Sequence, residues 1–217
     1  MEPGFEIALH LFWEKNRNLI LLAIAVALLA IVAREGFRYF AAQREKGVQA
    51  EYARVSDQPA KLAAFAEAHP SHVLAGIAWL QLADTKFSAG DFTAATASYQ
   101  KAVSSLKNDA LLGRAKLGAA ISQVSGGNRA AGEAALKTLS ADATLRKGVR
   151  VEATYHLAAL AAESGNADEV RKLVEQASHI DMTSPWSQRA TLLLASLPAG
   201  GKPAEDPASG LSFKPGK

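Results

Sequence analysis

The sequence has 217 residues, of which 49% are hydrophobic and 21% are charged, with a formal net charge of +3 and no cysteine. This composition excludes a wholly disordered chain, a disulfide scaffold and a thiolate metal site, and so mild a charge does not indicate nucleic-acid binding. Alanine is the commonest residue, and four of the eight prolines fall within residues 198–217. We therefore expect an all-α protein, because alanine has the highest helix propensity. The mean hydropathy of +0.01 is high for a soluble protein.

The hydrophobic excess is concentrated near the N-terminus, where residues 18–33 contain no charged side chain. A helix of that length spans about 24 Å, less than the about 30 Å of membrane hydrocarbon. Aromatic residues flank the run on both sides, and the helix from Trp13 to Tyr39 covers about 39 Å, the thickness of a bilayer with its interfaces. We predict a transmembrane helix over residues 18–40, after a short cytoplasmic N-terminus over residues 1–17.

Two other interpretations of this run stay open. A buried helix of a soluble domain would have to hide a surface that is apolar all round. A cleaved signal peptide fits the length of the run, and Ile31-Val32-Ala33 is a tolerable cleavage site. Acidic residues before the run and the aromatic band after it favour a retained anchor, because a cleaved peptide needs neither.

The charges beside the run bear on its orientation. Two basic residues, Lys15 and Arg17, precede it, whereas four follow it, namely Arg34, Arg38, Arg44 and Lys46. The positive-inside rule, applied literally, keeps the C-terminal part in the cytoplasm. The margin is small, and acidic residues lie among these charges, so the sequence alone does not settle the orientation.

Residues 41–72 are expected to form linking helices. Helix continues after the apolar run to about Val55, where Ser56 or Asp57 can cap a new helix and Pro59 suits its first turn. This short helix is expected to end at about Ala68. Residues 69–72 form the next break.

A period then follows in residues 73–197. Gly90-Asp91, Gly127-Asn128 and Gly165-Asn166 are spaced by 37 and 38 residues, and each pair lies between two apolar helical segments. Glycine tolerates the positive φ that ends a helix, and Asp or Asn caps the next helix. The spacing predicts an α-solenoid of about three helix-turn-helix repeats of the tetratricopeptide (TPR) type.

The residues inside the repeats support this type. When the first unit is numbered from Gly76, the large and small residues fall at the expected TPR positions, which are Trp79 at 4, Leu82 at 7, Ala83 at 8, Gly90 at 15, Ala95 at 20, Tyr99 at 24 and Ala102 at 27. The third unit, numbered from Val151, has Leu157 at 7, Ala158 at 8, Gly165 at 15 and Ala177 at 27, and it departs from the pattern with Thr154 at position 4. In the second unit, Leu117-Gly118 resembles the pair at positions 7 and 8 but is two residues out of register.

A last helix follows the third unit. Thr183 or Ser184 is expected to cap it, and it runs through Trp186 to about Leu197. A single helix suits the terminal cap of a solenoid. The tail over residues 198–217 is expected to be disordered, and Leu211 and Phe213 within it form at most a short docking motif.

No catalytic, cofactor-binding or metal site emerges. His69 and His72 have a metal-compatible spacing but no third ligand nearby, and no nucleophile elbow, HExxH motif or phosphate loop is present. We therefore expect a non-enzymatic protein with protein partners and no small-molecule substrate. The first helix of each TPR unit lines a groove that suits a peptide or a partner helix. This predicts a protein-binding groove formed by Ile77, Leu80, Asp84, Phe87, Glu152, Tyr155 and Ala159, unless neighbouring helices cover these residues.

Several segments together resemble a known family. They are residues 11–16 (LFWEKN), 36–40 (GFRYF), 78–83 (AWLQLA) and 90–95 (GDFTAA). The arrangement is similar to the ancillary subunit family of the bacterial Sec translocon (SecYEG), whose members have a single span and TPR-like repeats. The resemblance covers most of residues 5–180.

The resemblance implies a bacterial inner-membrane protein with a cytoplasmic N-terminus and a periplasmic repeat domain. It also implies as partners the Sec translocon, a membrane-anchored periplasmic chaperone of the prolyl-isomerase type, and exported polypeptides. This orientation conflicts with the count of flanking charges. A long domain can nevertheless cross the membrane largely regardless of such charges. A cytoplasm-facing receptor or assembly factor, and a soluble periplasmic protein released by cleavage, are the alternatives.

Overall fold

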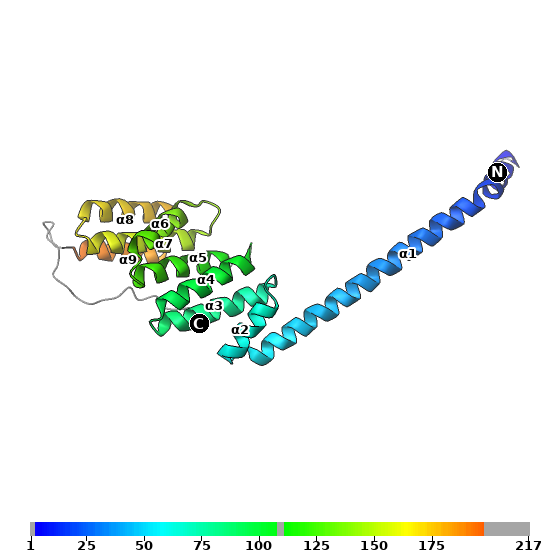
Figure 1. Ribbon diagram of the computed structural model, residues 1–217. Helices are drawn as coiled ribbons and strands as arrows, with labels where there is room; N and C mark the ends of the chain where they lie inside the picture. The colour runs from blue at the N-terminus through cyan, green and yellow to red at the C-terminus, as the bar shows by residue number, and fades with distance from the viewer. Residues whose placement is uncertain (1–2, 108–110, 198–217) are drawn as a thin grey trace. The chain divides into compact units, whose positions relative to one another are not determined.

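The computed structural model describes residues 3–107 and 111–197, and within them it is all-α, as the composition predicts (Figure 1). The chain divides into two compact units, residues 1–53 and residue 54 onward. The helices of the described residues are α1 Pro3–Val55, α2 Pro59–Ala68, α3 Val73–Ser88, α4 Phe92–Leu106, α5 Leu112–Ser125, α6 Arg129–Ala141, α7 Lys147–Glu163, α8 Ala167–Asp181 and α9 Pro185–Ala195. The tail predicted for residues 198–217, with Leu211 and Phe213, lies outside the described residues.

The first unit is formed by the long helix α1. Its 53 residues correspond to about 80 Å of helix, and it is long and apolar enough to cross a membrane by length and composition. Its large apolar side chains are exposed; Leu19 and Val32, for example, are each 69% exposed. The helix continues without a break past residue 41, where the sequence predicts the change from membrane helix to linking helix. The limits of a membrane span within α1 therefore stay a prediction.

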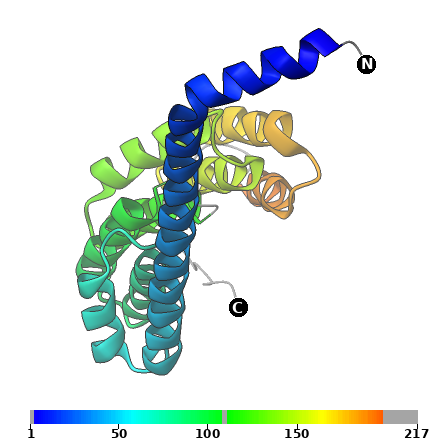
Figure 2. The ribbon, with the colours of Figure 1, turned by 90° about the vertical axis from the view of Figure 1, so that its right-hand side faces the viewer.

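The second unit is a stack of helix pairs. α3 pairs with α4, α5 with α6 and α7 with α8, and each pair packs against the next. Figure 2 shows these helices following one another through the stack in chain order. Within each pair the turn contains a glycine of positive φ: +79° at Gly90, +88° at Gly127 and +71° at Gly165. The three glycines from which the repeat was predicted are therefore the residues that end the first helix of each pair.

The second repeat follows the TPR pattern in the register that Gly127 sets, which makes Gly113 its position 1. Positions 8 and 20 are then Ala120 and Gly132, and both are buried. A Cβ on Gly132 would lie 2.7 Å from the carbonyl oxygen of Ala120, so α5 and α6 approach closely there. Gly118 has another partner, because a Cβ on it would lie 2.5 Å from the ring of Tyr99 in the preceding repeat. Leu117-Gly118 therefore does not occupy positions 7 and 8, in agreement with its being two residues out of register with Gly127.

The helix ends follow the predicted capping residues in most places. Asp91 accepts from the backbone N–H of Ala94 at 3.0 Å, and Asn166 accepts from that of Glu169 at 3.1 Å. Ser184, one of two expected caps of α9, accepts from Trp186 N–H at 3.2 Å. At α2 the N-cap is Gln58, whose side chain makes no capping hydrogen bond, rather than Ser56 or Asp57. α9 packs against both α7 and α8, as expected for a solenoid cap.

Candidate functional site

The groove residues predicted on α3 are only partly accessible. Leu80 and Phe87 are 5% and 7% exposed, and the Phe87 ring packs edge-to-face against Phe92 at 5.2 Å. These two residues therefore belong to the core, which corrects the expectation that they form an exposed patch. Ile77 and Asp84 are half-buried and lie on the accessible part of the helix.

Asp84 holds three helices together. The Tyr99 hydroxyl of α4 donates to Asp84 Oδ1 at 2.6 Å, and the Arg114 guanidinium of α5 pairs with Asp84 Oδ2. Burial, followed by the adjacent Asp84 carboxylate, raises the pKa of Tyr99, so the phenol stays a hydrogen-bond donor. The Asp84 carboxylate is thus occupied by contacts within the domain. The Nε atom of Arg114 is buried and has no hydrogen-bond partner among the described residues.

The groove residues predicted on α7 lie near α9. Tyr155 and Glu152 are half-buried, and the Tyr155 ring lies 5.2 Å from that of Trp186. Glu152 has no hydrogen bond or ion pair within the described part of the chain, and burial raises its pKa to about 7 against the opposing effect of Arg114 and Arg189. Ala159, the third predicted residue of this helix, is also half-buried.

His156 lies on the same helix, one turn after Glu152. It is 2% exposed, and neither ring nitrogen has a partner in the described residues. Burial lowers its pKa to about 4, and its ring lies 5.8 Å from that of Trp186. The guanidinium of Arg189 lies over the Trp186 ring, 4.5 Å from its centroid. His156 is therefore a neutral packing residue.

The raised pKa of Glu152 predicts a pH-dependent effect of Glu152→Gln. Because the folded pKa of about 7 lies above the ordinary 4.5, the contribution of Glu152 to stability is present below about pH 4.5 and is lost as the pH rises through 7. We expect Glu152→Gln to be more stable than the wild type by about 2 kcal/mol at about pH 8, after discounting for solvent screening.

Urea unfolding of both proteins at pH 8 and pH 4.5 checks this expectation. The two stabilities should come within about 0.5 kcal/mol of each other at the lower pH, because Glu152 is then protonated in the folded state and about half protonated in the unfolded state. The contribution of His156 is common to both proteins. Equal stability at pH 8 would contradict the unpaired, half-buried position of the carboxylate.

The sequence reasoning missed Arg114, Trp186 and Arg189. Arg114 occupies position 2 of the second repeat, as Ile77 and Glu152 do in the first and third. Numbering the second repeat so that Gly127 is position 15 would have identified Arg114. The likeness of Leu117-Gly118 to positions 7 and 8 suggested a different numbering. Trp186 and Arg189 belong to α9. The TPR pattern describes only the helix pairs, so it does not predict that α9 contacts Tyr155 and His156 on α7.

The two candidate metal ligands have other contacts. His72 Nδ1 accepts from the backbone N–H of Leu74 at 3.1 Å and so caps α3. The His69 ring packs against Phe65 at 4.8 Å. Within residues 3–107 and 111–197, no group of three His, Cys, Asp or Glu is placed to hold a metal ion.

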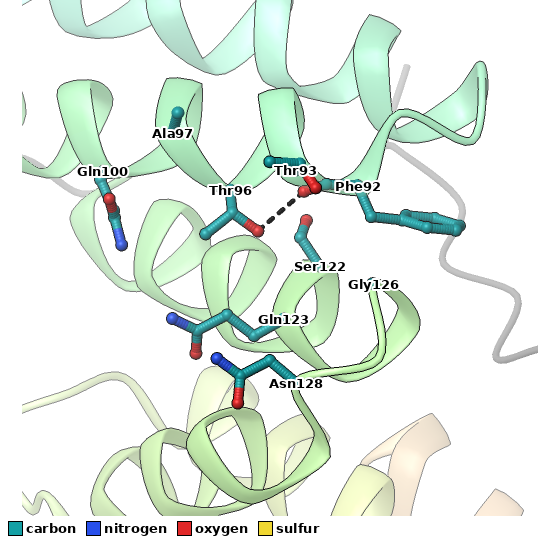
Figure 3. A pocket seen from close by; sticks show the side chains of 9 residues that line it. All are labelled: Phe92, Thr93, Thr96, Ala97, Gln100, Ser122, Gln123, Gly126 and Asn128. Carbon is teal, nitrogen blue, oxygen red and sulfur yellow. Dashed lines mark hydrogen bonds between the residues drawn. The ribbon is translucent and has the colours of Figure 1, made fainter.

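A separate cleft lies between α4 and the C-terminal half of α5 (Figure 3), and we refer to it as the α4–α5 cleft. Its volume is about 260 Å³ and no charged residue lines it; the lining residues are Phe92, Thr93, Thr96, Ala97, Gln100, Ser122, Gln123, Gly126 and Asn128. Figure 3 shows Gln123 and Asn128 side by side on one wall, with Gln100 on the other. The predicted groove contains none of these residues.

Asn128 differs from its counterparts in the other repeats. It occupies the N-cap of α6 but makes no side-chain cap hydrogen bond, whereas Asn166 caps α8. We therefore expect Asn166→Ala to lower the free energy of unfolding by about 1 kcal/mol, and Asn128→Ala to lower it by less than about 0.5 kcal/mol. Urea denaturation of the two variants checks this difference, and equal losses would show that Asn128 caps α6 in solution.

Comparison with protein families gives one decisive result. The tetratricopeptide repeat-like domain family matches residues 10–139. The chain belongs to this family. The matched range begins within α1 and ends within α6, so it includes the apolar helix and the first two repeats. Comparison with curated proteins gives no match. Comparison with solved structures gives none either.

Membership explains the arrangement of the described residues. TPR-like domains are scaffolds that bind proteins and are typically non-catalytic. The third repeat lies beyond the matched range, yet α7 and α8 repeat the geometry of the first two pairs. The second unit is thus a TPR-like domain with protein partners, preceded by one long apolar helix.

Proposed function

We propose that the protein is a membrane-tethered scaffold that binds other proteins at the Sec translocon and assists a periplasmic chaperone in handling exported polypeptides. The observation that carries the proposal is that one chain contains both an exposed apolar helix and a TPR-like domain. The resemblance of residues 11–16 and 36–40 to the ancillary translocon subunit family supports the finer assignment. It also supports an inner-membrane location with the repeats in the periplasm.

Anchoring the repeat domain to the membrane would increase its apparent affinity for membrane partners. An anchored domain meets a membrane partner at a raised effective concentration, so a modest binding surface suffices. Among the predicted groove residues, Ile77, Glu152, Tyr155 and Ala159 are half-buried and remain candidates for that surface. Asp84 is a weaker candidate, because Tyr99 and Arg114 already engage its carboxylate.

Purification from membranes in mild detergent tests the proposal. We expect translocon subunits or a membrane-anchored chaperone to be recovered with the protein. A chain whose α1 residues 18–33 are replaced by an unrelated apolar span, with the repeat domain intact, is the matched control for contacts made within the membrane. Recovery of the protein alone would contradict the assignment to the translocon.

A cytoplasm-facing receptor is a second candidate, favoured by the four basic residues that follow the apolar run against the two that precede it. Protease added to spheroplasts separates the two orientations, because only a periplasmic repeat domain is digested. The N-terminal sequence of the mature protein tests the third alternative, release by cleavage. Beginning the mature chain after Ala33 would show that the apolar run is a signal peptide.

A further inference from the structure

The helix α9 occupies the place of the first helix of a fourth repeat. Position 3 of each first helix is an alanine that is 0% exposed, and α9 continues this series at the same spacing; the four residues are Ala78, Ala115, Ala153 and Ala190. α9 packs against α7 and α8, as α7 packs against α5 and α6 (Figure 1). The series therefore places Leu192 at position 5 of α9, which is a groove position of the TPR pattern.

The apolar row at position 5 becomes exposed toward the end of the stack. Leu80 and Leu117 are 5% and 2% exposed, Tyr155 is half-buried, and Leu192 is 70% exposed. A further helix follows each of the first three in the stack, whereas no helix follows α9 within the described residues. Because the outer face of a terminal solenoid helix is normally polar, the exposure of Leu192 indicates that another segment covers it.

An aromatic and an acidic group continue the surface that begins at Leu192. Trp186 precedes Leu192 by six residues, or about 9 Å of helix, and its ring lies 5.2 Å from that of Tyr155 on α7. Glu152 is half-buried and lies one turn before Tyr155. Short turns join α7, α8 and α9, so α7 and α9 run in the same direction. These four residues, which we call the groove end, thus present apolar, aromatic and acidic groups in that order.

The chain that follows α9 contains complementary groups in the same order. Leu211, Phe213 and Lys214 are apolar, aromatic and basic. In an extended chain, side chains two residues apart lie on one side, about 7 Å from each other, which is close to the spacing along the groove end. The 13 residues 198–210 that precede this segment can span about 45 Å. That reach exceeds the length of α9, so the chain can turn back to the groove end.

We propose that residues 211–214, the tail segment, bind the groove end of their own chain. Leu211 then covers Leu192. Phe213 and Lys214 lie at the aromatic and the acidic position. A ligand on the same chain acts at a raised effective concentration, so this small surface suffices for binding.

The groove end overlaps the predicted protein-binding groove, since both contain Glu152 and Tyr155. A partner that binds these residues must therefore displace the tail segment. This consequence rests on the proposed scaffold role. The docking itself does not, because the occupant belongs to this chain, and the recovery of partners in the co-purification has no bearing on it.

A binding titration with the full-length protein in detergent micelles tests the inference. The probe is a fluorescein-labelled peptide of residues 198–217, followed by fluorescence anisotropy at pH 8, above the pKa of about 7 of Glu152. The variant Leu211→Ser with Phe213→Ser, called the tail variant, frees the groove end, so we expect it to bind the probe about tenfold more tightly than the wild type. No binding by the tail variant would overturn the inference. Equal binding by the tail variant and the wild type would overturn it as well, because the groove end would then accept the tail of a second copy rather than its own.

Two further substitutions in the tail variant locate the site. Leu192→Ser should weaken binding of the probe about tenfold, because the central apolar contact is lost. Met182→Ser is the matched control, since Met182 is 74% exposed and follows α8 directly, and it should bind within about twofold of the tail variant. Circular dichroism melting confirms that both proteins are folded. Equal binding by the two would overturn the assignment to the groove end.

A second probe tests the order of the groups. Exchanging Leu211 and Lys214 within the peptide keeps its composition and net charge but reverses the apolar and basic positions. We expect this exchanged probe to bind the tail variant about tenfold more weakly. Equal binding of the two probes would overturn the match between the tail segment and the groove end, because composition alone, as in adsorption to the micelle, would then account for the binding.

Discussion

Gly132→Ala is expected to lower the free energy of unfolding of the repeat domain by about 3 kcal/mol. The added Cβ would lie 2.4 Å from Val124 Cγ2, 2.7 Å from the carbonyl oxygen of Ala120 and 2.9 Å from the backbone nitrogen of Val124. Two of these atoms belong to the backbone of α5 and cannot rotate away. The two helices of the second repeat must therefore separate, although alanine is the better helix former.

Gly148→Ala is the matched control for this substitution. Gly148 also lies in a helix of the repeat domain, but a Cβ there meets nothing within 4 Å. We expect it to stabilise the domain by up to about 1 kcal/mol, because alanine loses less backbone entropy than glycine when a helix forms. Urea unfolding followed by circular dichroism measures both variants. A loss of less than about 1 kcal/mol for Gly132→Ala would contradict the close packing of α5 on α6.

Ile24→Asp together with Leu28→Asp is expected to abolish retention of the protein in the membrane. Both side chains are exposed, at 50% and 58%, so the substitution leaves the packing of the repeat domain unchanged. An aspartate near the centre of a membrane helix costs about 2.5–3.5 kcal/mol. The pair therefore disfavours insertion by about 6 kcal/mol, more than a thousandfold in partition.

Carbonate extraction of membranes, followed by immunoblotting of pellet and supernatant, measures this effect. Gln43→Asp with Gly47→Asp is the control, because it places the same charges at the same spacing on the same helix beyond the apolar run. The control should stay in the pellet while the double variant moves to the supernatant or is degraded. If the double variant remains in the pellet, α1 is not the element that holds the protein in the membrane.

The repeat architecture could be predicted from the sequence because its determinants are local. A glycine of positive φ and a capping residue act within one turn, so Gly90, Gly127 and Gly165 identified the helix pairs without knowledge of the fold. The small residues at positions 8 and 20 report helix packing within one repeat. Gly118 could not be explained in this way, because its partner Tyr99 belongs to another repeat and a single repeat pattern does not contain that contact.

The candidate sites were less predictable because they depend on contacts between repeats. Leu80 and Phe87 occupy groove positions of the pattern, yet adjoining elements bury them. The α4–α5 cleft is lined by residues of two successive repeats. These residues come together only in three dimensions, so the sequence contains them but not the reason to group them.

The carboxylate of Asp84 also bears on how the domain loses its structure. A solenoid in which each repeat contacts only its neighbours can melt from its ends, one unit at a time. Here Asp84 accepts a hydrogen bond from its own repeat through Tyr99 and pairs with Arg114 of the next, and Arg114 in turn acts electrostatically on Glu152 of the third. These side chains link the stability of all three repeats. Melting should therefore occur in one cooperative transition, with no populated form in which only the first repeat is folded.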